Sequence, residues 1–99
     1  GTTATAGKDR GVAPGDAAAQ TTFILDKILA AISALGASAQ DIVRTRIYLT
    51  NEKDASAVSR AHGRFFSDIQ PANTLIVVAK LIGDYCVEIE AEALVLYPE

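Results

Sequence analysis

Three glutamates occur at every second position of the segment VEIEAEA near the end of the chain: Glu88, Glu90 and Glu92. In a β-strand this spacing places the side chains on one face, with about 7 Å between neighbours. Like charges in such a row repel one another unless water or cations relieve them. Arg44 and Arg46 have the same spacing in an earlier segment and could pair with these glutamates across strands. A glutamate here therefore either joins a solvated, ion-paired sheet face, or lines a cleft and handles a proton or a water.

The other candidates for chemistry are His62 and Cys86, the only histidine and the only cysteine. They are too few for a zinc site made by one chain, and no glycine-rich phosphate loop is present, so we predict no metal and no cofactor. His62 lies beside Val58 and Phe65 in a helical pattern, which favours packing or a structural hydrogen bond over a role in a pocket. Cys86 is best explained as a small hydrophobic residue.

The composition indicates one globular domain. The chain has 99 residues, of which 49% are hydrophobic and 21% charged, and its net charge is −3. An acidic chain without a basic face is a poor nucleic-acid binder. The uninterrupted apolar runs are too short to span a bilayer, and no signal peptide is recognised, so we predict a cytoplasmic protein with no membrane partner.

Hydrophobic periodicity predicts an α+β fold. Residues 17–35 have an apolar stripe at helical spacing, with Asp16 as the N-cap and Gly36 at the C-terminal end. Further elements are expected as a strand at 43–50, a helix at 54–68, and strands at 74–81 and 86–97. The last two strands are expected to form an antiparallel hairpin, and the segment 5–15 to be a loop. The result is one sheet with its helices on one face.

In the strand 43–50, two faces are distinguishable. Alternation predicts that Val43, Thr45, Ile47 and Leu49 point to one side of the sheet, and that Arg44, Arg46, Tyr48 and Thr50 point to the other.

Several segments in this order resemble the RidA/YjgF family of reactive-intermediate deaminases, also named endoribonuclease L-PSP. They are GTTATAG, GDAAAQT, ILDKI, ALGASAQDIVRTRIYLT, AHGRFFSDIQPANTL and VEIEAEALV, and together they extend over nearly the whole chain. The resemblance implies a chorismate-mutase-like mixed sheet with two helices, assembled as a homotrimer with small-molecule clefts between subunits. It also implies that residues 1–99 form a single domain without the N-terminal strands that are usual in the family.

The resemblance assigns roles to both ends of a cleft. Glu88 matches the residue that positions the attacking water during imine hydrolysis, and Gly1 and Thr2 match the strand that cradles the ligand. Asn73 stands where deaminating members carry an arginine that binds the carboxylate of a 2-imino acid. A neutral amide cannot reproduce that charged, two-pronged contact.

Three further positions differ from the deaminating members. Ser59 stands where asparagine is common, His62 where an aromatic residue is common, and Leu75 where some relatives have cysteine. We therefore expect weak or absent 2-imino-acid deamination, with imine or enamine hydrolysis or non-catalytic metabolite binding as the alternatives. A nucleic-acid role, described for some relatives, is disfavoured by the net charge.

Overall fold

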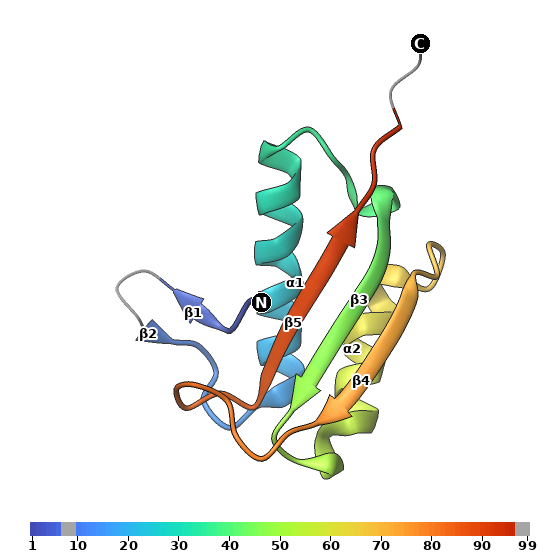
Figure 1. Ribbon diagram of the computed structural model, residues 1–99. Coiled ribbons are helices and arrows are strands. Elements are labelled where there is room, and N and C mark those ends of the chain that lie inside the picture. The colour runs from blue at the N-terminus through green and yellow to red at the C-terminus, as the bar shows by residue number, and fades with distance from the viewer. Residues whose placement is uncertain (7–9, 97–99) are drawn as a thin grey trace.

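The computed structural model describes residues 1–6 and 10–96. Two helices lie on one face of a three-stranded sheet, and a small two-stranded ribbon lies beside them (Figure 1). The elements are β1 (Thr5–Ala6), β2 (Arg10–Gly11), α1 (Ala17–Ala34), β3 (Ile42–Leu49), α2 (Ala55–Phe66), β4 (Ala72–Val77) and β5 (Val87–Ala93). Short 3₁₀ helices span Ala39–Asp41 and Glu52–Asp54. The predicted α+β fold with both helices on one face is confirmed.

The sheet has the strand order β4-β3-β5. β4 pairs parallel with β3, and β5 pairs antiparallel with β3. The predicted hairpin between the last two strands is therefore wrong, because β3 lies between them. A parallel pair needs a long crossover connection, and α2 supplies it between β3 and β4.

Helix α1 has the predicted ends. The Asp16 side chain accepts a hydrogen bond from the Ala19 amide at 3.0 Å, and Gly36 has a φ of 90°. Ile24, Leu25 and Ile28 are buried against the rest of the domain. By length and composition alone α1 could cross a membrane, but core helices pass the same test.

Strand β3 forms the centre of the core, with one deviation from simple alternation. The ladder with β5 has a register shift between Ile42 and Arg44. As a result Ile42 is 2% exposed and Val43 is 48% exposed, so the prediction that Val43 points to the same side as Thr45, Ile47 and Leu49 is wrong. From Thr45 onward the predicted alternation holds, and Ile47 and Leu49 are buried. A bulge rotates the preceding side chains in this way.

The remaining boundaries differ from the sequence prediction. β4 begins and ends earlier than the predicted strand 74–81, so Asn73 lies within the strand and not before it. β5 is shorter than the predicted strand 86–97, whose last residue lies outside the described residues. The segment 5–15 was predicted to be a loop, but it contains the antiparallel β1–β2 pair. Strands of two residues are too short to show alternation in the sequence.

Candidate functional site

The face of the sheet that points away from the helices carries the predicted charged ladder. Arg46 lies opposite Glu90 in the β3–β5 register, and Arg44 lies opposite Glu92. The Arg46 guanidinium is 3.5 Å from the Glu90 carboxylate and 3.3 Å from the Glu92 carboxylate. The predicted pairing between the two strands is confirmed for Arg46.

Glu90 is held by a second partner, Tyr48, whose hydroxyl donates a hydrogen bond to its carboxylate. This hydrogen bond, together with the charge of Arg46, lowers the pKa of Glu90. The same hydrogen bond raises the pKa of Tyr48. Glu90 is thus an ionised carboxylate already engaged by its neighbours.

Glu88 has different surroundings, at the start of the chain. The Thr2 amide donates to the Ile89 carbonyl at 2.8 Å, and the Ile89 amide donates to the Thr2 carbonyl at 2.9 Å. This bridge brings Gly1 so close to Glu88 that a Cβ atom at position 1 would overlap the carboxylate. We call Gly1, Thr2 and Glu88 the Glu88 group. The structure brings these three predicted site residues together.

A second cluster lies where α2 packs beside the edge strand β4. The Asn73 side-chain Nδ2 donates to the Thr45 hydroxyl at 3.2 Å, and the same hydroxyl lies 2.9 Å from His62 Nε2. The His62 ring also packs on Phe66, with ring centroids 4.7 Å apart. Burial lowers the pKa of His62, which favours the neutral imidazole. The predicted structural hydrogen bond of His62 is confirmed.

Ser59 and Leu75 extend this cluster along its two elements. Ser59 is exposed and lies three residues before His62 on α2, on the same side of the helix. Leu75 lies two residues after Asn73 on β4, on the same face of the strand. We call Ser59, His62, Asn73 and Leu75 the Asn73 group.

The two groups lie on opposite faces of the sheet. Asn73 pairs with Thr45, which is completely buried on the side of the helices. Glu88 pairs with Tyr48, on the side that points away from the helices. β3 lies between their strands, so a single chain does not bring the Asn73 amide to the Glu88 carboxylate.

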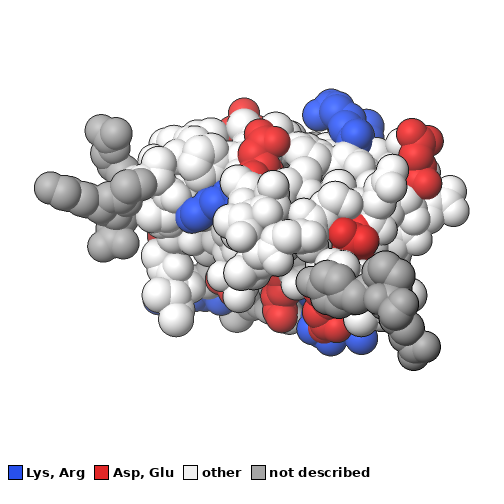
Figure 2. Space-filling model, turned by 90° about the horizontal axis from the view of Figure 1, so that it is seen from above, with Lys and Arg blue, Asp and Glu red and all other residues white. Residues whose placement is uncertain are grey.

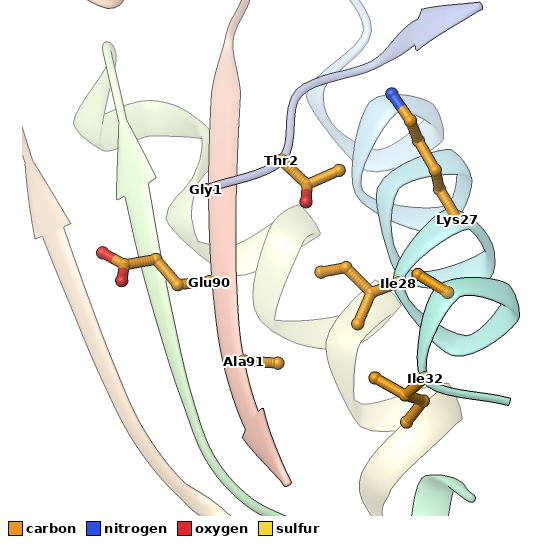
Figure 3. Close-up of a pocket in the computed structure, with 8 residues that line it drawn as sticks. Gly1, Thr2, Lys27, Ile28, Ile32, Glu90 and Ala91 are labelled. Carbon is orange, nitrogen blue, oxygen red and sulfur yellow. The ribbon is translucent and has the colours of Figure 1, made fainter. Parts of the chain in front are cut away.

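Neither of two hollows in the described part of the chain joins the two groups. The first, of about 380 Å³, lies between α1 and β5 (Figure 3). It is lined by Gly1, Thr2, Lys27, Ile28, Ala31, Ile32, Glu90 and Ala91. Its wall is mainly apolar, and the Glu90 carboxylate points away from it, toward β3 (Figure 3).

The second hollow, of about 700 Å³, lies between the β1–β2 pair and the turn before β5. Its lining includes Thr5, Ile82 and Tyr85, and none of the predicted site residues. The Tyr85 and Thr5 hydroxyls are hydrogen-bonded to each other. These hydroxyls are thus occupied within the domain.

Charges on the face seen in Figure 2 and metal-ligating side chains among the described residues indicate no further site. On the face seen in Figure 2, acidic and basic side chains are scattered among uncharged ones and form no single-sign patch. Among the described residues, no group of three or more histidine, cysteine, aspartate or glutamate side chains is placed to hold a metal ion.

Sequence reasoning missed Thr45, which the structure places between Asn73 and His62. Its hydroxyl lies on the core-facing side of β3, beside the buried Ile47, and its burial makes a hydrogen-bond partner necessary. The single polar position in an otherwise apolar face was the available signal. The Tyr48–Glu90 pair was missed because alternation gives the face of each residue and not its partner across the ladder.

The comparisons with known proteins define the family. The profile of the family described as Endoribonuclease L-PSP matches residues 1–95. The chain is 36% identical over 94 residues to the uncharacterized protein SCO2049 of Streptomyces coelicolor, covering 94% of this chain and 69% of that protein. It is 35% identical over 86 residues to the 2-iminobutanoate/2-iminopropanoate deaminase of Escherichia coli, covering 84% and 67%.

A solved structure agrees with these relatives. The structure of Rv2704 from Mycobacterium tuberculosis, a member of the YjgF/YER057c/UK114 family, is 38% identical, with a TM-score of 0.83 over 96% of this chain and 75% of that one. The chain therefore belongs to the Endoribonuclease L-PSP family, the family of YjgF and RidA. It spans about two thirds of the length of the curated relatives named above.

Proposed function

We propose that this protein forms a homotrimer whose subunits share small-molecule clefts, each joining the Glu88 group of one subunit to the Asn73 group of another. The observation that carries this proposal is the position of the two groups on opposite faces of one sheet. A ligand can contact both only if two chains meet. The exposed edge strand β4 supplies a suitable contact, because Ile76 and Val77 are 44% and 50% exposed there.

The chemistry that fits such a cleft is hydrolysis of a neutral imine or enamine. Water adds to the carbon of the C=N bond, the C–N bond breaks, and the nitrogen leaves as an amine or ammonia. Glu88 can accept a hydrogen bond from the attacking water and take up its proton. Among the described residues, Glu88 makes no side-chain hydrogen bond or ion pair, whereas Glu90 is engaged by Tyr48 and Arg46.

Asn73 determines which imines are accepted. It is neutral, and its Nδ2 already donates to Thr45, so it offers no cationic fork to a carboxylate. Ordinary 2-imino-acid deamination is therefore weak or absent in this proposal. The Escherichia coli relative is named for that deamination, so the proposed difference lies in substrate class and not in reaction type.

A non-catalytic protein that binds a small metabolite in the same cleft is the second candidate. It is favoured by the same loss of the anion contact, because a cleft that captures no imino acid can still hold a neutral ligand.

The deciding experiment is the hydrolysis of a neutral ketimine, followed by its ultraviolet absorbance, beside that of a freshly generated 2-imino acid. We expect the protein to accelerate the neutral ketimine, Glu88→Gln to lower this rate by about 10²-fold or more, and Glu92→Gln to leave it unchanged. Equal rates for Glu88→Gln and the parent protein would refute the role of Glu88. Binding of the ketimine without acceleration would instead support the non-catalytic candidate.

A further inference from the structure

The side chain of Asn73 is one end of a short series of hydrogen bonds that includes Thr45 and His62. Its Nδ2 donates to the Thr45 hydroxyl at 3.2 Å, and the hydroxyl oxygen lies 2.9 Å from His62 Nε2. Thr45 is completely buried, and His62 is partly buried against Phe66. The series thus runs from an exposed amide through a buried hydroxyl to a packed imidazole.

The donors and acceptors of this series fix one another. A hydroxyl has one hydrogen to donate. Because the Thr45 oxygen accepts from Asn73, its hydrogen is available for His62 Nε2, which accepts it when the neutral ring carries its proton on Nδ1. Burial favours that neutral ring.

This arrangement decides what Asn73 presents to a ligand. The side-chain amide is planar, so when Nδ2 points to Thr45 the carbonyl Oδ1 points away from Thr45. Asn73 is exposed, and Oδ1 and the remaining N–H are the groups that its hydrogen bond to Thr45 leaves for a ligand. A carboxylate can accept from that N–H, but its oxygens meet Oδ1 acceptor against acceptor. A carboxamide both donates and accepts, so it can pair with both atoms.

We propose that Thr45 and His62 are positioning residues that lock Asn73 with its carbonyl toward the cleft, and that the site therefore selects neutral ligands bearing a carboxamide or similar donor–acceptor group over carboxylates. The selection rests on the proposed cleft, whereas the locked amide is a property of one chain.

The first test needs no ligand. Nitrogen-15 chemical shifts of the imidazole distinguish the two neutral tautomers, and we expect His62 to carry its proton on Nδ1. In Thr45→Val, which keeps the shape of threonine and lacks the hydroxyl, the side-chain amide signals of Asn73 are expected to shift and to average toward solvent-exposed values. Thr45→Ser keeps the hydroxyl and is expected to keep the parent signals. A proton on His62 Nε2 would overturn the proposal, because the Thr45 oxygen would then accept from His62 and its hydrogen would be free to donate to the Asn73 carbonyl, so the amide would not be locked.

The second test uses pyruvamide and pyruvate, two probes of nearly the same shape. We expect the parent protein and Thr45→Ser to bind pyruvamide about tenfold more tightly than pyruvate, and Thr45→Val to reduce this preference to about threefold or less. Preference for pyruvate would overturn the selection. Binding of neither probe would overturn the selection. If His62 nevertheless carries its proton on Nδ1, the hydrogen bonds that hold Asn73 are present and the failure lies with the proposed cleft.

Discussion

Replacing Asn73 by arginine should create a carboxylate site where the protein now has a neutral amide. Asn73 has one N–H left after its hydrogen bond to Thr45. Arginine brings a charge and a planar fork that can donate two parallel hydrogen bonds to a carboxylate. Each hydrogen bond to a charged group is worth about 1.5–3 kcal/mol. Two of them correspond to about 10²–10⁴-fold tighter capture.

The lower end of that range is the expected result. Position 73 is exposed on an edge strand, and water and salt weaken charged contacts there. We therefore expect Asn73→Arg to increase kcat/KM for a freshly generated 2-imino acid by about 10²-fold. The assay follows release of ammonia or disappearance of the imine.

Two controls distinguish the planar geometry of the arginine from its charge alone, and test whether the gained activity needs the water that Glu88 is proposed to bind. Asn73→Lys carries the charge without the planar fork and should gain less activity. Glu88→Gln in the arginine background should abolish the gain, because the gained substrate still needs the proposed water-binding carboxylate. The reasoning would be refuted if the parent protein already deaminates 2-imino acids as fast as Asn73→Arg, since another cation would then occupy the site.

Three further predictions concern the domain itself. Tyr48→Phe removes the hydrogen bond that lowers the pKa of Glu90, so that pKa should rise in an NMR titration. The stability that Glu90 contributes above the unfolded-state pKa of glutamate should then be lost at a higher pH as the solution is acidified. An unchanged titration would contradict the assigned cause. Burial lowers the pKa of His62 in the folded state, so the unfolded chain takes up its proton first as the pH falls below about 6.5. His62→Phe should therefore lose less unfolding free energy than the parent between about pH 7 and pH 5. An equal dependence of the unfolding free energy on pH in both proteins would refute the burial of a neutral ring. Ile89→Ala should lower the unfolding free energy measured with urea by about 2–5 kcal/mol, because Ile89 is 0% exposed, whereas Ile82→Ala, at 93% exposure, should change it by about 0.5 kcal/mol or less; similar losses for both would contradict the described core.

Much of the fold could be predicted from the sequence because periodicity reports which face of an element is buried. The helix after Asp16 and the inward face of β3 from Thr45 onward follow from spacing alone. Periodicity does not report which strands are neighbours. An antiparallel hairpin and a strand order with β3 in the middle give the same alternation, and this explains the wrong pairing predicted for the last two strands.

The candidate site was predictable in its parts and not in its arrangement. The resemblance supplied Glu88 and Asn73 as positions, but only the register of the sheet shows that they face opposite sides. The bulge before Arg44 and the hydrogen bonds of Thr45 depend on tertiary packing, which no local pattern of residues encodes.

The central claim is that the cleft is made by more than one chain, and the most direct measurement is the molar mass of the protein in solution by light scattering, across a range of concentrations. We expect a homotrimer of about 31 kDa, three times the 10.4 kDa of this 99-residue chain. A protein that remains at 10.4 kDa at every concentration would contradict it, because the Glu88 group and the Asn73 group could then never face the same ligand.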